Sequence, residues 1–206
     1  LYYNKLMSKL ETTEEERNKW RERISKEVKL AVKVQENFLP KRNLKNYPVH
    51  GINLSAREVS GDFFSFYPHN DNIYFIIADV AGKGIHAGMV MAKASTLFEV
   101  LSQSKVDPDE MVLHMNNDLN NTKTGGMFVT SIIGEYNLIT DEIRWVNAGH
   151  QPAIVRDDNG KYEQFQSSAP PLGVIKQKDK SIYNINKMKL NGSRFYAFTD
   201  GLSESL

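Results

Sequence analysis

The first 39 residues contain neither glycine nor proline, and Pro40 ends this run. The segment is dense in Glu, Lys and Arg, which favour helix, whereas glycine and proline break it. We therefore predict one long helix that stops before Pro40. Because so long a helix rarely stands alone in water, we expect residues 1–40 to form a linker or coiled-coil helix that precedes a separate domain at 41–206.

Side chains in this segment follow a heptad-like spacing of four and three residues, typical of a coiled coil. The positions are Leu6, Leu10, Thr13, Arg17, Trp20 and Ile24, followed after a register break by Val28, Ala31, Gln35 and Phe38. Thr13, Arg17 and Gln35 are polar, so this seam is imperfect. Two interpretations stay open: an amphipathic helix packed on the following domain, and a two-stranded coiled coil that makes a homodimer and carries a signal.

From residue 51 onward the pattern is dominated by strands. Two helices, expected at Ile85–Gln103 and Pro108–Asn120, interrupt runs of apolar, β-branched and aromatic residues. Expected strands are Ile52–Glu58, Ile73–Ala78, Met127–Tyr136, Ile143–Asn147, Ala153–Arg156, Tyr162–Gln166, Tyr183–Leu190 and Arg194–Thr199. Two helices between runs of antiparallel strands predict an α+β sandwich and not alternating βαβ units.

Composition excludes several classes of protein. The formal net charge is +1, so bulk charge favours neither a nucleic-acid partner nor a membrane surface. No cysteine is present, which rules out disulfides, thiolate metal sites and a cysteine nucleophile. No apolar run approaches the ~20 residues of a membrane span. The chain starts at Leu1 and not at Met, so we interpret it as a fragment, with any membrane anchor expected upstream.

The stretch IADVAGKGIHAG at 77–88 invites a nucleotide-binding interpretation. A P-loop fails at both ends, because its first glycine would be Ile77 and its hydroxyl residue would be Gly84. The dinucleotide fingerprint matches weakly through Gly82, Gly84 and Ala87. It also requires an acid at the end of a second strand, whereas Glu99 falls in a helical pattern. We therefore do not favour a nucleotide site.

Three aspartates share one context, each lying beside or near a glycine and close to the end of an apolar strand: Asp62, Asp79 and Asp200. One such residue alone is typical of a turn. If the strand ends converge, mutual repulsion raises the pKa values of the carboxyl groups unless a cation neutralises them. Magnesium and manganese prefer oxygen ligands, and a pair of them can activate water against a phosphoryl group.

At this point the chain resembles the SpoIIE-type branch of the metal-dependent type-2C (PPM) protein phosphatase superfamily. The matching segments occur in the family's order and cover most of residues 30–206: VQENFLP (34–40), SGDFFSF (60–66), IADVAGKGIHAGMVMA (77–92), MFVTSIIGEYN (127–137), VNAGHQPAIV (146–155), PPLGV (170–174) and FYAFTDGLSES (195–205).

The resemblance implies an αββα sandwich of two antiparallel sheets flanked by helices. It implies hydrolysis of phosphoserine or phosphothreonine on a protein by water held between two Mn²⁺ or Mg²⁺ ions. By position, Asp62 would help hold one metal, Asp79 would bridge both, Asp200 would hold the other, and Val80 would offer its main-chain carbonyl. Asp62, Asp79 and Asp200 are therefore the expected catalytic residues.

The chain departs from the family at three places. Ser65 stands where the family often has a second acid, and Ala78 where it often has glycine before the bridging aspartate. The family also carries a further helix and a last strand with another metal-binding aspartate, beyond the position of Leu206. We therefore expect the chain as given to bind metal weakly and to turn over poorly.

Several expectations about context follow from the resemblance. The substrate would be a phosphorylated regulatory protein, such as an anti-sigma-factor antagonist, and the location cytoplasmic, including the cytoplasmic part of a membrane-anchored sensor. The alternative is a pseudo-phosphatase that binds a phosphoprotein or dimerises without hydrolysis.

Lys83 is interpreted as a solvated loop residue in preference to a phosphate ligand, and His150 as a hydrogen-bonded turn residue in preference to a general acid. Asn147 is interpreted like His150.

Overall fold

The computed structural model of the chain describes residues 2–40, 47–53, 59–122 and 124–202, with the main chain alone at 4, 6, 8 and 10–12. Its elements run in the order α1 (Tyr2–Gln35), η1 (Glu36–Phe38), β1 (Phe63–His69), β2 (Asn72–Val80), α2 (Ile85–Gln103), α3 (Pro108–Asn121), β3 (Val129–Asn137), β4 (Glu142–Ala148), β5 (Ala153–Arg156), β6 (Tyr162–Phe165), β7 (Asn186–Lys189), β8 (Arg194–Tyr196) and η2 (Asp200–Leu202).

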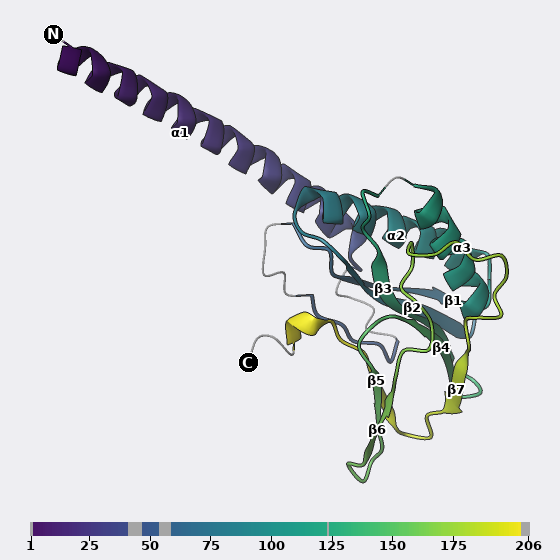
Figure 1. Cartoon of the computed structure of the whole chain (residues 1–206). Helices are drawn as coiled ribbons and strands as arrows, with labels where there is room; N and C mark the ends of the chain where they lie inside the picture. The colour runs from purple at the N-terminus through teal and green to yellow at the C-terminus, as the bar shows by residue number, and fades with distance from the viewer. Residues whose placement is uncertain (1, 41–46, 54–58, 123, 203–206) are drawn as a thin grey trace.

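The strands form two antiparallel sheets, one with the order β1-β2-β3-β4-β7 and one with the order β6-β5-β8. Helices α2 and α3 pack on one face of the larger sheet (Figure 1), and the smaller sheet packs against its other face. Each side chain on a strand points to the face opposite its neighbour's. The larger sheet therefore contributes to two separate apolar cores.

The first core lies between the larger sheet and the two helices. It is built from residues of alternating strand positions and of the inner helix faces, including Ile76, Ala78, Met91, Phe98 and Met115. The second core lies between the sheets, around Trp145, which is fully buried. The ring of Trp145 meets those of Phe165 and Phe195 edge-on, with centroids 5.1 Å away in each case. This aromatic contact fixes the smaller sheet on the larger one.

The predicted α+β class with two antiparallel sheets is confirmed. Helix α2 and strand β5 have the bounds expected from the sequence. In the part of the chain that the structure describes, helices cover the larger sheet, and no helix packs on the outer face of the smaller one.

The structure differs from the strand predictions at three places, β1, β7 and β8, and a further prediction lies largely outside the described residues. Strand β1 was not expected, because Pro68 and a run of aromatic residues give it no clean alternation. The strand predicted at Ile52–Glu58 falls largely on 54–58, outside the described residues, and Ile52 and Asn53 have no strand structure. The last two predicted strands are shorter: β7 begins only at Asn186 and β8 ends at Tyr196, so that Asp200 opens a 3₁₀ turn.

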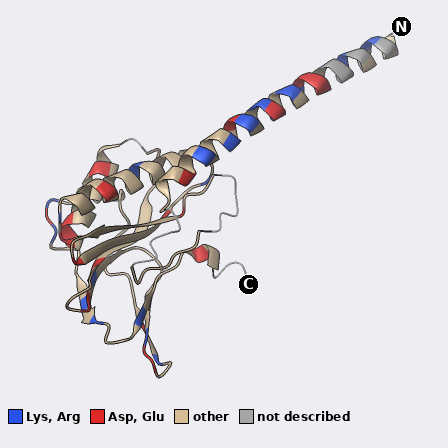
Figure 2. Cartoon of the chain, turned by 180° about the vertical axis from the view of Figure 1, so that it is seen from behind, with Lys and Arg blue, Asp and Glu red and all other residues tan. Residues whose placement is uncertain are grey.

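Helix α1 projects from the domain (Figure 1), and its outer part contains positively and negatively charged residues along its length (Figure 2). The ion pairs Arg17–Glu14 and Arg23–Glu27 join neighbouring turns, and the guanidinium of Arg23 lies over the ring of Trp20. Exposed pairs of this kind stabilise a helix only slightly. These ion pairs are therefore too weak to account for the stability of the outer part of α1.

The residues of the heptad-like seam differ in exposure before and after the register break. Trp20 and Ile24, before the break, are exposed, whereas Gln35 and Phe38, after it, are partly buried against the domain. Phe38 packs on the first core, and its carbonyl accepts a hydrogen bond from the hydroxyl of Ser95 on α2. The end of α1 and the turn η1 thus pack on the domain, whereas the outer part of α1 projects from it and does not fit the interpretation of one long helix packed on the domain.

Within the described ranges, none of the helices combines the length and the apolar content that crossing a membrane requires.

Truncation of the buried tryptophan should loosen the contact between the sheets. We expect Trp145→Ala to lower the free energy of unfolding by about 3–5 kcal/mol in urea titrations, because it removes a large ring from a closed core. Tyr162→Ala is the control, since Tyr162 is an aromatic residue of edge strand β6 with 65% of its surface exposed. Its cost should stay within about 0.5 kcal/mol. Equal effects of the two changes would contradict this account of the core.

Candidate functional site

The pairing of β1 with β2 brings two of the expected acids together. Phe63 pairs with Ala78 at the end of this antiparallel ladder. The next residues along the two strands are Asp62 and Asp79, so their Cα positions come opposite each other. The carboxyl groups of Asp62 and Asp79 lie within hydrogen-bonding reach of each other. Both acids were predicted to lie at strand ends, and the register of β1 with β2 makes them neighbours.

Two glycines allow the surrounding chain to approach this pair. A Cβ at Gly61 would lie 2.9 Å from the main-chain oxygen of Val80, a distance that no real side chain tolerates. The main chain beside Asp62 therefore packs directly on the Val80 carbonyl. A Cβ at Gly201 would lie 4.0 Å from Oδ2 of Asp62, which brings the η2 turn to the same place.

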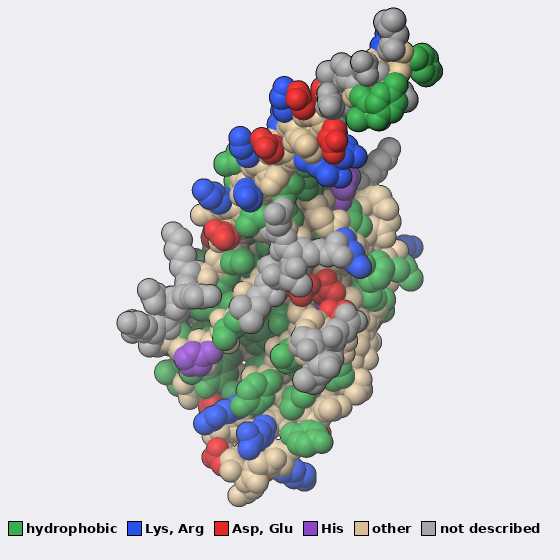
Figure 3. Space-filling model, turned by 90° about the vertical axis from the view of Figure 1, so that its left-hand side faces the viewer, with side chains coloured by type: hydrophobic (Ala, Val, Ile, Leu, Met, Phe, Trp, Pro, Cys, Tyr) green, Lys and Arg blue, Asp and Glu red, His purple; other side chains and the backbone are tan. Residues whose placement is uncertain are grey.

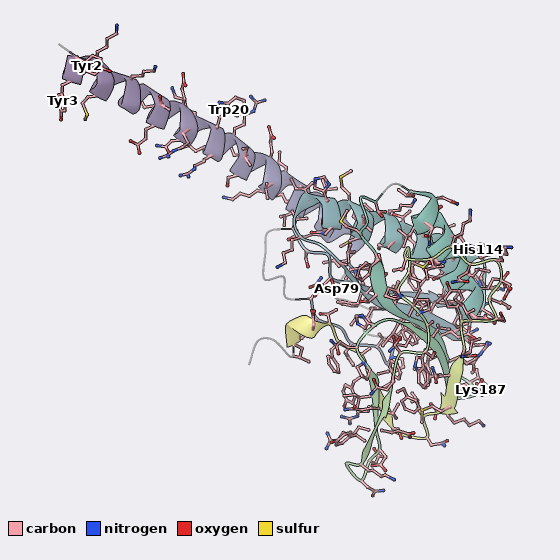
Figure 4. The ribbon with its side chains drawn as sticks, viewed as in Figure 1. Tyr2, Tyr3, Trp20, Asp79, His114 and Lys187 are labelled. Atoms are coloured by element: carbon pink, nitrogen blue, oxygen red, sulfur yellow. The ribbon has the colours of Figure 1, made fainter. Side chains whose placement is uncertain are left out.

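The third acid, Asp200, stands at the start of η2. Figure 4 shows Asp79 on the side of the sheet that faces η2. Figure 3 shows acidic side chains gathered near the middle of the molecular face on which η2 lies. The charge of Asp200 acts on Asp79. The structure thus brings Asp62, Asp79, the Val80 carbonyl and Asp200 into one region.

This arrangement is electrostatically unfavourable without a cation. The pKa of Asp79 rises from 3.8 to about 7, first because the carboxyl is half-buried, then because it shares a hydrogen bond with Asp62, and finally because Asp62 and Asp200 are negative. Each cause disfavours the ionised form. Carboxylates and a main-chain carbonyl are the oxygen donors that Mg²⁺ and Mn²⁺ prefer.

Among the residues that the structure describes, no three acid or imidazole groups are arranged tightly enough to form a ready metal centre. The donor set nevertheless fits a hard divalent cation, because the carboxyl groups of Asp62 and Asp79 share a hydrogen bond and the charge of Asp200 acts on Asp79. Asp62 is further held by main-chain contacts: its N–H donates to the hydroxyl of Ser60, and its carbonyl accepts from the side chain of Asn53.

His150 and Asn147 are buried members of a hydrogen-bonded turn, as preferred from the sequence. The N–H of His150 donates to Oδ1 of Asn147, and Nδ2 of Asn147 donates to the carbonyl of Gln151. Burial lowers the pKa of His150 to about 4. The imidazole is therefore neutral at neutral pH, which does not suit a general acid. Lys83 and His86 are exposed in and beside the loop after β2.

Sequence reasoning missed two polar residues near the acids. The side-chain amide of Gln35, at the end of α1, donates to the carbonyl of Ser60 over 2.6 Å and accepts from the N–H of Ser60 over 3.2 Å. It therefore ties the long helix to the segment that precedes Asp62. Thr130 pairs with Asp79 across the β2–β3 ladder and contacts His150. The one signal in the sequence was that Gln35 is itself a polar residue at an otherwise apolar position of the seam.

The raised pKa of Asp79 predicts how stability depends on pH when no metal is present. The folded protein holds a proton that the unfolded chain releases near pH 4, so this contribution is present at low pH and is lost as pH rises through about 7. Because Asp79 is only half-buried, we expect a loss on the order of 1–2 kcal/mol between pH 5 and pH 8.

Urea titrations of the metal-free protein at several pH values measure this loss. Asp79→Asn should flatten the profile between pH 5 and pH 8, whereas Asp71→Asn, at the exposed turn between β1 and β2, should leave it unchanged. A profile that is equally steep in the Asp79 variant would show that Asp79 is not the group responsible.

The chain is similar to known proteins both in sequence and in fold. The model of the family "Stage II sporulation protein E (SpoIIE)" matches residues 69–206. The chain is 25% identical to phosphoserine phosphatase RsbU of Bacillus subtilis over 185 residues, which is 88% of this chain and 54% of RsbU. It is 26% identical to phosphoserine phosphatase RsbP of Bacillus subtilis over 87% of this chain and 45% of RsbP. The chain thus spans about half the length of these relatives.

Among solved structures, the fold is similar to the SiaA-PP2C domain of Pseudomonas aeruginosa, with a TM-score of 0.72 and 16% identity over 88% of this chain and 73% of that one. It is also similar to the PP2C phosphatase domain of SpoIIE from Bacillus subtilis, with a TM-score of 0.61 and 22% identity over 71% of this chain and 43% of that one. The family match covers about two thirds of the sequence, and the chain belongs to the SpoIIE family.

Proposed function

We propose that the chain is a metal-dependent protein serine/threonine phosphatase domain. One observation carries this proposal: in a chain of the SpoIIE family, Asp79 shares a hydrogen bond with Asp62 and feels the charge of Asp200, and Gly61 packs on the Val80 carbonyl beside them. Two relatives are named phosphoserine phosphatases. In this proposal residues 41–206 are the phosphatase domain, and residues 1–40 are the helix that connects it to a partner or to a sensor.

Asp79 would bridge two divalent cations, Mn²⁺ or Mg²⁺, with Asp62 and the Val80 carbonyl on one side and Asp200 on the other. Bound cations would supply the charge that neutralises a phosphoryl group and lowers the pKa of water. The chain's own contribution is placement. The β1–β2 register holds Asp62 opposite Asp79, and the contact between Gly61 and Val80 keeps the carbonyl within reach of the same region.

The proposed substrate is a phosphoserine or phosphothreonine of a regulatory protein, such as an anti-sigma-factor antagonist, in the cytoplasm. The names of RsbU and RsbP support a phosphoserine substrate. The site is compatible with a protein substrate because Asp79 is only half-buried near the end of β2.

A binding module without hydrolysis is the second candidate. It is favoured by one observation, that the described residues do not form a ready cluster of three metal ligands. Phosphate release by the full-length chain discriminates between the two candidates.

The assay measures phosphate release from a phosphoserine protein by the full-length chain, with Mn²⁺ and with a chelator. We expect release with Mn²⁺, none with the chelator, and a loss of at least about 100-fold in kcat/KM for Asp79→Asn, because the bridging carboxylate would be lost. Asp71→Asn serves as the control of equal chemistry at an exposed turn and should keep the wild-type rate. A folded protein that releases no phosphate with any divalent cation would overturn the proposal in favour of the binding module.

We also propose that the outer half of α1 pairs with a second copy in a homodimer. Trp20 and Ile24 lie on the heptad-like seam and are 62% and 55% exposed. Burying such side chains between two helices would supply the stability that the isolated helix lacks. Gln35 links the same helix to Ser60, two residues before Asp62. The pairing of α1 would therefore influence the position of the acids and of α2.

The dimer can be tested with a matched pair of variants. Ile24→Glu should shift the full-length protein towards monomer in sedimentation, because it places a charge within the seam, and should change the rate of phosphate release. Leu30→Glu introduces the same charge on an equally exposed residue outside the seam and should remain dimeric. A wild-type chain that sediments as a monomer at all concentrations would refute this pairing.

A further inference from the structure

His150 lies between the two segments that carry Asp79 and Asp200. Its side chain is buried, with 6% of the residue exposed. On one side, Nδ1 lies 2.9 Å from the hydroxyl oxygen of Thr130. Thr130 is the residue that pairs with Asp79 across the β2–β3 ladder. One ring nitrogen therefore contacts the strand position directly opposite the central acid.

The other ring nitrogen is buried, and within the described part of the chain no hydrogen bond of ordinary geometry reaches it. The main-chain carbonyl of Phe198 acts on the ring and favours its protonated form, and the charges of Asp62 and Asp200 act in the same direction. Phe198 stands two residues before Asp200. Buried polar atoms are nearly always paired, and one that is unpaired indicates strain or a functional role.

The hydrogen bonds of Thr130 indicate which ring nitrogen carries the proton. The hydroxyl of Thr130 has one proton and two acceptors within reach, Nδ1 of His150 at 2.9 Å and the carbonyl of Asp79 at 3.4 Å. The shorter contact is the stronger one. The Phe198 carbonyl can accept only from an N–H and favours the protonated ring, so the proton of the neutral ring lies on Nε2 and Nδ1 accepts from Thr130. The unpartnered buried atom is thus an N–H donor next to the segment that leads to Asp200.

The turn that carries His150 is built to hold the ring in a fixed place. Asn147, which is fully buried, accepts from the N–H of His150. Gly149 adopts a φ of +71°, and a Cβ there would lie 2.4 Å from Cγ of Pro171. Only glycine fits this position. The main chain of His150 is therefore fixed on both sides, independently of the acids.

We propose that His150 is a positioning residue that spans the acid site. Its Nδ1 holds Thr130 opposite Asp79, and its Nε2–H is directed to the main-chain carbonyl of Phe198, two residues before Asp200, so the ring sets the distance between Asp79 and Asp200. This inference rests on the proposed function in so far as both acids hold the same divalent cations. The ring touches neither substrate nor cation.

The experiment measures Mn²⁺ binding to the full-length chain by the spin resonance signal of free Mn²⁺, alongside phosphate release. His150→Ala removes both contacts, His150→Asn keeps an acceptor near Nδ1, and His150→Gln keeps a donor near Nε2. Thr130→Val and Thr130→Ser form a second pair that removes or keeps the hydroxyl without altering His150. His114→Ala is the control, because His114 is exposed on α3 (Figure 4).

We expect His150→Ala and Thr130→Val to weaken Mn²⁺ binding by about 10-fold or more, as loss of a group that orients a metal ligand does. Thr130→Ser should bind as the wild type does, and His150→Asn and His150→Gln should be intermediate. At saturating Mn²⁺, kcat should change by less than about 3-fold, because the chemistry itself does not use the ring. Unchanged Mn²⁺ binding in folded His150→Ala, or a fall in kcat alone, would overturn the inference.

Nitrogen NMR of the metal-free chain tests the same proposal without cation or turnover. The expected result is a neutral His150 ring with its proton on Nε2, and loss of the Nδ1 hydrogen bond in Thr130→Val but not in Thr130→Ser. A proton on Nδ1 in the wild type would contradict the inference. A wild type that binds Mn²⁺ but releases no phosphate would overturn the proposed function, and the binding data would still decide the role of His150.

Discussion

The antiparallel pairing of β1 with β2 is the constraint on which the site depends. It sets the Cα atoms of Asp62 and Asp79 opposite each other at the end of a ladder, and the two carboxyl groups come within hydrogen-bonding reach. Two carboxylates so close together repel each other unless one holds a proton or a cation lies between them. The raised pKa of Asp79 is the consequence in the metal-free chain. The fold therefore tolerates an unfavourable contact at the place where a divalent cation would turn it into a favourable one.

The rest of the molecule holds this contact in place from three sides. The core of α2 and α3 supports the larger sheet from one face, and the aromatic contact of Trp145 joins the smaller sheet to the other. The smaller sheet leads through β8 to the turn that carries Asp200. Gln35, at the end of α1, is bonded to Ser60 beside the first acid. A change in the seating of α1 would thus reach Asp62 through only two residues of main chain, which gives the proposed regulation a short physical path.

Much of the fold and the identity of the acids could be predicted from the sequence, because these features have local causes. Helix α2 and strand β5 follow from uninterrupted local patterns, and each acid is marked by an adjacent or nearby glycine at a strand end. Strand β1 could not be predicted from the sequence, because it is an edge strand and contains Pro68. Its stability comes from pairing with β2 and not from a regular alternation of apolar and polar residues. The contacts of Gln35 with Ser60 and of Thr130 with His150 join residues 20 or more positions apart. The polar side chain of Gln35 interrupts the apolar seam, but no residue near Gln35 or Thr130 in the sequence indicates which distant residue it contacts.

The central claim is that Asp62, Asp79 and Asp200 form one divalent-cation site. Its most direct test is a crystal structure of the full-length chain grown with Mn²⁺, with anomalous data collected at the manganese absorption edge. The account predicts an anomalous peak between the carboxyl groups of Asp62 and Asp79, within coordinating distance of the Val80 carbonyl, and a second peak shared by Asp79 and Asp200. Anomalous peaks confined to other surfaces, with the three carboxyl groups free of metal at saturating Mn²⁺, would contradict it.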